Sequence, residues 1–152
     1  GYMPMSSCIV KDKIYNTFSD NTDKDCTFYH GNTYAGHPIG CAAALAAIEV
    51  YESEEIIRKS IEKASFMKME LNDFNSISCV ENIRSLGMIG VVELKKEFTK
   101  KIPIIKNTLK ELGYLFRPLG SVFYLMPPLI ISKKELKKAI DVLKFVLENT
   151  KD

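Results

Sequence analysis

Arg117 carries the group in this chain that is best suited to bind a carboxylate. It stands directly before Pro118, and a residue before proline is biased towards extended backbone, so its guanidinium projects from a fixed position. That planar fork can bind a carboxylate through two parallel hydrogen bonds. The local pattern fits equally well an arginine at a strand edge that pairs with a surface glutamate. The segment alone leaves both interpretations open.

The loop of Gly31, Asn32 and Thr33 has the composition of a phosphate-binding turn. Glycine lets a backbone approach a ligand closely, and a threonine hydroxyl and its own N–H can hold a phosphate oxygen. The helix expected to begin near Pro38 adds the positive end of its dipole close by. A plain loop that leads into a buried helix would have the same composition, and this alternative stays open on the residues alone.

Two cysteines and two histidines are spaced symmetrically, as Cys-x3-His followed by His-x3-Cys: Cys26, His30, His37 and Cys41. A zinc ion needs four such donors around one point. The close cysteine pair of the usual zinc motif is missing, and Cys41 lies in an Ala-rich run that predicts a helix. We therefore predict no metal site.

The composition is that of an ordinary globular protein. Of the 152 residues, 46% are hydrophobic and 26% are charged, and the formal net charge is +2. So small a charge, with no basic run interleaved with aromatic residues, gives no support for a nucleic-acid partner. No apolar run reaches membrane-spanning length. The cysteines show no paired spacing, which favours reduced thiols and a cytoplasmic protein.

The elements that would position these side chains alternate between helices and strands. Apolar periodicity and end signals predict helices over residues 39–51, 54–73, 103–112 and from Ser132 onward, and residues 11–18 could form a helical turn. Short β-prone runs predict strands over residues 5–10, 88–94, 114–117 and 122–125, and residues 79–86 form either another strand or a turn into the one that follows. This alternation predicts an α/β fold with helices packed on a sheet.

Three of the expected helices have a predicted contact surface. The helix over residues 39–51 is apolar on all sides, which predicts a buried helix. The apolar face predicted for the helix over residues 54–73 consists of Ile57, Ile61, Ala64 and Leu71. The face predicted for the last helix, with Ser132 as its N-cap, consists of Leu136, Ile140, Leu143 and Leu147.

Three motifs, in order along the chain, resemble those of the class III pyridoxal-phosphate aminotransferases. Residues 30–44, HGNTYAGHPIGCAAA, are similar to the HGxTYxGxPxxCAAA segment of that family, and residues 82–93, NIRSLGMIGVVE, to its VRxLGxIGVVE strand. Residues 117–120, RPLG, and 124–128, YLMPP, are most similar to the branch that converts 8-amino-7-oxononanoate to 7,8-diaminononanoate in biotin biosynthesis. The similarity covers essentially the whole chain.

The resemblance implies the C-terminal part of a fold-type-I transferase that depends on pyridoxal 5'-phosphate. Residues 1–37 would end the large cofactor-binding domain, residues 38–52 would form a connecting buried helix, and residues 53–152 would form the small α/β domain. The family also implies a homodimer with shared active sites. The expected reaction is amino transfer to the oxo-acid, with S-adenosylmethionine, or else lysine, as the amino donor.

By the same resemblance, a small set of residues contacts the cofactor and the substrate. Asn32 and Thr33 would bind the cofactor phosphate and Gly31 would touch substrate, all three in the active site of the partner subunit. Arg117 would hold the carboxylate of the oxo-acid, and Tyr124 would line the site near it. One departure concerns Asn32, whose position is often Pro or His in relatives, so the expected contact depends on whether the backbone or the side chain makes it.

No lysine in this chain matches the position of the lysine that forms a Schiff base with the cofactor in this family. In the family that lysine lies a few residues before the segment that the first four residues, GYMP, resemble. The chain also opens without an initiator methionine. We therefore expect a fragment that lacks the catalytic lysine and is inactive alone.

Two alternatives stay open. The chain could come from another class III ω-aminotransferase, acting on ornithine or a related amine. It could also be a non-catalytic α/β dimerisation module encoded at this length, which would not bind pyridoxal phosphate.

Overall fold

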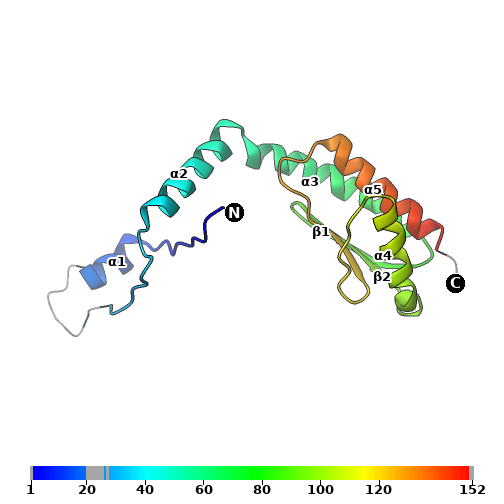
Figure 1. The fold of residues 1–152 in the computed structure, drawn as a ribbon, viewed down its shortest axis with the longest axis horizontal. Helices are drawn as coiled ribbons and strands as arrows, with labels where there is room; N and C mark the ends of the chain where they lie inside the picture. The colour runs from blue at the N-terminus through cyan, green and yellow to red at the C-terminus, as the bar shows by residue number, and fades with distance from the viewer. Residues whose placement is uncertain (1, 20–25, 27, 151–152) are drawn as a thin grey trace. The chain divides into compact units, whose positions relative to one another are not determined.

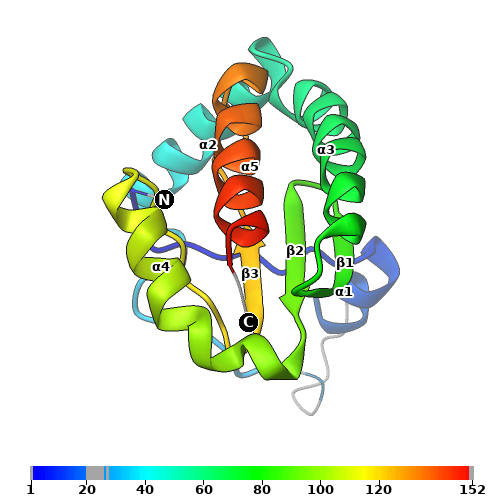
Figure 2. The ribbon, with the colours of Figure 1, turned by 90° about the vertical axis from the view of Figure 1, so that its right-hand side faces the viewer.

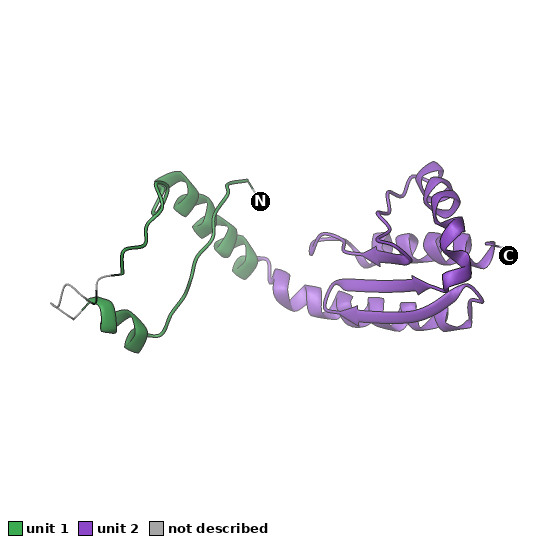
Figure 3. Ribbon diagram, turned by 90° about the horizontal axis from the view of Figure 1, so that it is seen from below, with its two compact units in different colours: residues 1–53 green, residues 54–152 purple. Residues whose placement is uncertain are grey.

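The structure is a computed structural model that describes residues 2–19, 26 and 28–150 (Figure 1). The chain forms two compact units, residues 1–53 (unit 1) and residues 54–152 (unit 2) (Figure 3). The expected assignment of residues 1–37 to a large domain, 38–52 to a connecting helix and 53–152 to a small domain stays a prediction. No helix within the described ranges has the length and apolar character needed to cross a membrane.

Unit 1 contains two helices, α1 (Asp12–Ser19) and α2 (Pro38–Ser53). The helical turn expected over residues 11–18 is present as a helix of 8 residues. The strand expected over residues 5–10 is wrong: this segment is exposed, and no strand pairs with it in the described part of unit 1. A β-prone run needs a neighbouring strand to bind its backbone groups, and a single run cannot supply one.

Helix α2 confirms the helix expected over residues 39–51 but contradicts its expected burial. Gly40 is its one buried residue, and Leu45 near its middle is 68% exposed. An apolar helix is normally stabilised by packing against a neighbour. In the described part of unit 1 no other helix or strand packs along α2. Its composition therefore predicted the helix correctly but could not supply the packing partner.

Unit 2 is built on a three-stranded antiparallel sheet in the order β1-β2-β3. The strands are β1 (Val80–Leu86), β2 (Ile89–Leu94) and β3 (Val122–Leu125), which confirms three of the expected strands. A two-residue turn joins β1 to β2. Its first residue, Gly87, takes a φ of 54°, in the left-handed region that glycine adopts without steric cost.

The strand expected over residues 114–117 is wrong. This segment forms no ladder with its neighbours, and the chain pairs with β3 through a bridge between Leu119 and Val122. The N–H of Leu119 donates to the carbonyl of Val122 (2.9 Å). Pro118 has no N–H, so it interrupts the row of donors that a ladder would need.

Two helices lie side by side on one face of the sheet, α3 (Ile56–Asn72) and α5 (Lys133–Glu148) (Figure 2). A third helix, α4 (Ile102–Glu111), packs against α5. Short 3-10 turns follow α3 and precede α4, at Asp73–Ser76 and Lys96–Lys101. The expected helices of unit 2 and its α/β layering are thus confirmed.

Ion pairs show that α3 and α5 run in the same direction. Lys137 of α5 binds Glu70 of α3 (3.0 Å), and further along α5 Lys144 binds Asp73, directly after the end of α3 (3.4 Å). The apolar face expected for α5 is confirmed, because all its members are buried: Leu136, Ile140, Leu143 and Leu147.

The apolar face expected for α3 is correct for Leu71, which is buried, and for Ala64, which packs against the core. It is wrong for Ile57 and Ile61, which are 56% and 62% exposed. The buried face consists of Ile56, Ser60, Lys63, Met67 and Leu71. Two polar residues on the buried face weakened the periodic signal there, and the two isoleucines outside it made a neighbouring face look more apolar.

At Gly90 on β2 the sheet lies close against α3. A Cβ added there would lie 2.6 Å from Cδ1 of Leu71 and 3.2 Å from Sδ of Met67. Both side chains are fully buried, so neither can move aside without disturbing the core around it.

We expect Gly90→Ala to lower the free energy of unfolding by about 1–3 kcal/mol, the usual cost of overpacking a core. Urea denaturation followed by circular dichroism measures this loss. Ser85→Ala is the matched control, because Ser85 pairs with Gly90 across the sheet and the change adds no atom. An unchanged midpoint for Gly90→Ala would contradict the close packing of α3 on β2.

Ser132 begins α5 with a capping box, as its predicted N-cap role requires. Its Oγ accepts a hydrogen bond from the N–H of Glu135 (3.1 Å), and the Glu135 carboxylate accepts bonds from the hydroxyl (2.6 Å) and the N–H (3.1 Å) of Ser132. The hydroxyl bond first, and then the backbone bond, lower the pKa of Glu135 below its ordinary value of 4.5.

We expect Ser132→Ala to lower the stability of the protein by about 1 kcal/mol at neutral pH, a typical loss for an N-cap. A lowered carboxyl pKa stabilises the folded state above pH 4.5, and this contribution disappears as the pH falls through the lower folded-state pKa. The difference between wild type and variant should therefore shrink on acidification, as measured by denaturation over a pH series. Ser76→Ala removes a hydroxyl that donates to a backbone carbonyl, that of Asp73, so its effect should not follow the titration of Glu135.

Candidate functional site

Gly31, Asn32 and Thr33 lie together on the surface of unit 1, at the turn that leads to α2. All three residues are exposed. The carbonyl of Asn32 accepts a hydrogen bond from the N–H of Ala35 (2.9 Å), which closes the turn. The Thr33 hydroxyl forms no hydrogen bond within the described residues. It is therefore available to a ligand.

His37 limits what the start of α2 can offer to an anion. Its Nδ1 accepts a hydrogen bond from the N–H of Gly40 (3.1 Å), and its carbonyl accepts one from the N–H of Cys41 (2.9 Å). Pro38, the first residue of α2, has no N–H. The N-terminus of α2 can therefore attract an anion through its helix dipole but has few free N–H groups to offer it. A phosphate held here would depend on the donors of the preceding turn, because the sequence has no lysine or arginine over residues 26–48.

A hollow of about 970 Å³ lies within unit 1, between residues 3–6 and the turn before α2. Asn32 lines this hollow together with Tyr34 and His37. Gly31 and Thr33 are not among its lining residues. Of the residues predicted to meet the cofactor and substrate in this region, the structure therefore brings Asn32 alone to the hollow.

Arg117 lies on the side of unit 2 that is turned away from the core. Phe116 beside it is buried and packs against Phe123, with ring centroids 6.4 Å apart. Because successive side chains of an extended chain point to opposite sides, Arg117 points outward. It is exposed and forms no ion pair with any residue that the structure describes. The alternative of a guanidinium occupied by a surface glutamate is thus not found within the described chain.

Tyr124 faces the side of the sheet that α3 and α5 leave uncovered. It is partly exposed, whereas its two neighbours in β3 are buried. Tyr124 pairs with Val91, which in turn pairs with Arg84, so these three residues form one row across the sheet. Arg84 forms an ion pair with Glu93 on the same face. This charged pair was not predicted, although the two-residue turn between β1 and β2 fixes the register that brings it together.

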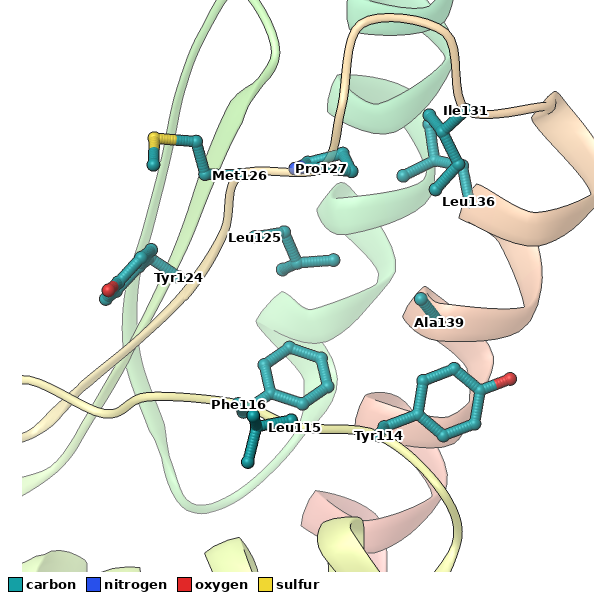
Figure 4. Close-up of a pocket in the computed structure, with 10 residues that line it drawn as sticks. All are labelled: Tyr114, Leu115, Phe116, Tyr124, Leu125, Met126, Pro127, Ile131, Leu136 and Ala139. Carbon is teal, nitrogen blue, oxygen red and sulfur yellow. The ribbon is translucent and has the colours of Figure 1, made fainter. Parts of the chain in front are cut away.

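A smaller cavity of about 180 Å³ lies beside β3 (Figure 4). The side chains of Phe116, Leu125 and Ala139 lie around it, whereas those of Tyr124 and Met126 point to the opposite side. Arg117 is not among its lining residues. The exposed guanidinium is therefore not part of this apolar pocket.

Comparison with known proteins identifies the family. The family model described as "Aminotransferase class-III" matches residues 1–147. The chain belongs to the class III aminotransferase family. An adenosylmethionine-8-amino-7-oxononanoate aminotransferase of Aquifex aeolicus is 33% identical over 157 residues, which cover 97% of this chain and 35% of the relative.

Solved aminotransferase structures share the fold. The structure of an adenosylmethionine-8-amino-7-oxononanoate aminotransferase from Methanocaldococcus jannaschii is 30% identical, with a TM-score of 0.78 over 91% of this chain and 34% of that one. A Bacillus anthracis aminotransferase is 29% identical, with a TM-score of 0.79 over 93% of this chain and 34% of that one. The predicted α/β fold, as part of a transaminase, is confirmed. The chain spans about a third of the length of these relatives.

The turn of this class III chain fits the phosphate of pyridoxal phosphate, the cofactor of the family. A Cβ built on Gly31 would meet no atom within 4 Å, so a ligand has room to approach the backbone. The unoccupied hydroxyl of Thr33 is a neutral donor two residues further along. Neutral donors beside a helix N-terminus are a common way to bind phosphate. The donor set therefore suits this group.

Proposed function

We propose that the intact protein is a pyridoxal-phosphate-dependent aminotransferase that converts 8-amino-7-oxononanoate to 7,8-diaminononanoate in biotin biosynthesis. S-adenosylmethionine is the proposed amino donor, and the proposed form is a cytoplasmic homodimer with shared active sites. The relatives named for this reaction and the RPLG and YLMPP motifs support the branch. The proposal concerns a protein of the relatives' length.

The observation that carries the proposal is the unpaired guanidinium of Arg117. An exposed arginine with all its donors available can bind the carboxylate of an oxo-acid through two parallel hydrogen bonds. Tyr124, seven residues further on, presents an amphipathic ring on the uncovered face of the same unit. We assign Arg117 to the substrate carboxylate and Tyr124 to the wall of the site near it.

The turn of unit 1 is assigned to the cofactor and the partner subunit's substrate. Asn32 and Thr33 would bind the cofactor phosphate, and Gly31 would touch substrate. Pyridoxal phosphate, when bound, supplies the electron sink for amino transfer. This chain's proposed contribution is to bind and orient the cofactor and the substrate. In the family, a lysine forms the covalent bond to the cofactor and moves the proton, and none of the lysines of this chain matches its position. That lysine would come from outside the present chain, which on this proposal is inactive alone.

An ornithine-type ω-aminotransferase of the same class and a non-catalytic module are the competing functions. A panel of amino donors and acceptors, tried with the intact protein, separates the two transaminases. Turnover of 8-amino-7-oxononanoate supports the proposal, and turnover of ornithine without it would contradict the branch. A folded protein that ignores pyridoxal phosphate would support the module instead.

In the intact protein, we expect Arg117→Ala to raise the KM for 8-amino-7-oxononanoate roughly tenfold to a hundredfold, as the loss of a charge-assisted contact implies. The KM of Arg117→Lys should lie between those of the wild type and Arg117→Ala, because lysine keeps the charge without the planar fork. Arg58→Ala is the control, since Arg58 is exposed on α3 and binds Glu55 and Glu62. Unchanged oxo-acid kinetics for Arg117→Ala would show that Arg117 does not bind the carboxylate.

We expect Thr33→Ala to weaken the binding of pyridoxal phosphate roughly tenfold, because one hydrogen bond to a charged group is lost. Release of the cofactor from the intact protein, followed by its absorbance, measures the change. Thr17→Ala removes the same atoms from α1, where the hydroxyl donates to the carbonyl of Lys13 (2.8 Å), and should leave cofactor affinity unchanged. Equal affinity in wild type and Thr33→Ala would exclude the assigned contact.

A further inference from the structure

Lys63 is the one charged residue that is buried within the described ranges of the chain. It is 9% exposed and lies on the face of α3 that packs into unit 2. On this face Met67 follows it by one turn. Moving an ammonium group out of water is unfavourable unless it is hydrogen-bonded. A buried position of this kind normally holds an apolar side chain. The presence of a lysine is therefore explained by the hydrogen bond that it makes.

The Nζ of Lys63 donates a hydrogen bond to the backbone carbonyl of Leu129. Leu129 lies in residues 127–131, which connect β3 to α5. The side chain of Leu129 is half-buried against the core. The lysine therefore connects α3 to a segment 66 residues further along the chain.

Residues 127–131 pack on the core through Leu129 and Ile131 but form few hydrogen bonds with other elements. Pro127 and Pro128 have no N–H groups with which to bind neighbouring backbone. The N–H of Ile131 donates to the carbonyl of Pro128 (3.0 Å), which closes a local turn without tying it to another element. Among the hydrogen bonds of the described residues, the bond from Lys63 is the one that joins this segment to the rest of unit 2.

Residues 127–131, which Lys63 binds through Leu129, begin three residues after Tyr124 and therefore constrain the end of β3. The ladder of β3 ends at Leu125, which pairs with Gly90. Met126 follows without a ladder partner and leads directly into Pro127. Pro127 lines the cavity beside β3 and lies three residues after Tyr124, whose ring points to the other side of the strand (Figure 4). A shift of the segment would therefore displace the end of β3.

We propose that Lys63 is a positioning residue for the substrate site. Its hydrogen bond to Leu129 holds residues 127–131, and through them it holds Tyr124 on the uncovered face of the sheet. The inference rests on the substrate role proposed above for Tyr124. A lysine suits this position because its four-carbon stem can lie on the buried face of α3 while its ammonium group reaches the carbonyl of Leu129.

Lys63→Met in the intact protein separates the hydrogen bond from the packing. Methionine is unbranched and apolar, so it can occupy the buried position of Lys63 without the hydrogen bond to Leu129. Lys68→Met is the matched control, because Lys68 is exposed on the same helix. Both variants lose one ammonium group, and only Lys63→Met loses the bond to Leu129.

Hydrogen exchange measures how firmly residues 127–131 are held, and it does not require an active enzyme. We expect the amide of Ile131, whose hydrogen bond to Pro128 closes the turn, to exchange roughly tenfold faster in Lys63→Met, the effect of one lost hydrogen bond from a charged donor on the segment. The amides of α5 and all amides in Lys68→Met should keep their wild-type rates. An unchanged exchange rate for Ile131, or an equal increase throughout unit 2, would overturn the proposal.

Steady-state kinetics test whether the held segment positions the substrate site. We expect Lys63→Met to raise the KM for the oxo-acid roughly tenfold, with kcat within about twofold of wild type, since a small displacement of a binding residue weakens binding. Local loosening with an unchanged KM would overturn the link to Tyr124. If wild type fails to turn over 8-amino-7-oxononanoate, the proposed function fails, while the exchange rates still decide whether Lys63 holds the segment.

Discussion

The close approach of α3 to β2 at Gly90 is the constraint on which the rest of unit 2 depends. Without a side chain at Gly90, Leu71 and Met67 lie directly against the sheet and are fully buried. This contact fixes the rotation and height of α3, and with them the level of Lys63 one turn before Met67. The parallel helix α5 is then attached to α3 by ion pairs, including that of Lys137 with Glu70. A bulkier residue at Gly90 would therefore disturb more than one pair of side chains.

Around β3, successive side chains alternate between the core and the outer surface of unit 2. Phe116 and Phe123 point into the core and pack against each other, so their neighbours Arg117 and Tyr124 point outward. A shift of one residue would bury a guanidinium and expose an aromatic ring, and both changes are unfavourable. The packing of Phe116 against Phe123 therefore also keeps Arg117 exposed and available to a ligand.

The sequence predicted those elements whose signals are local. Ser132 and Glu135 carry the capping box of α5, and Gly87 carries the turn between β1 and β2. Predictions failed where the outcome depends on a distant partner. The run over residues 5–10 has strand composition but no pairing strand in the described part of unit 1, and α2 has the composition of a buried helix but no cover there. The motifs located the candidate site residues, whereas the unpaired state of Arg117 depends on neighbours that only the fold defines.

The failed prediction for the face of α3 and the inference about Lys63 have the same physical origin. Polar residues on a buried face weaken its apolar signal, so a pattern search selects another face. The two polar residues differ, however, in what they require. Ser60 donates to the carbonyl of Ile57 (2.7 Å) and is satisfied within its own helix. The ammonium of Lys63 lies at the end of a long stem and needs an acceptor elsewhere, so its burial carries information about tertiary structure that the burial of a serine does not. Here that acceptor belongs to the segment that follows Tyr124.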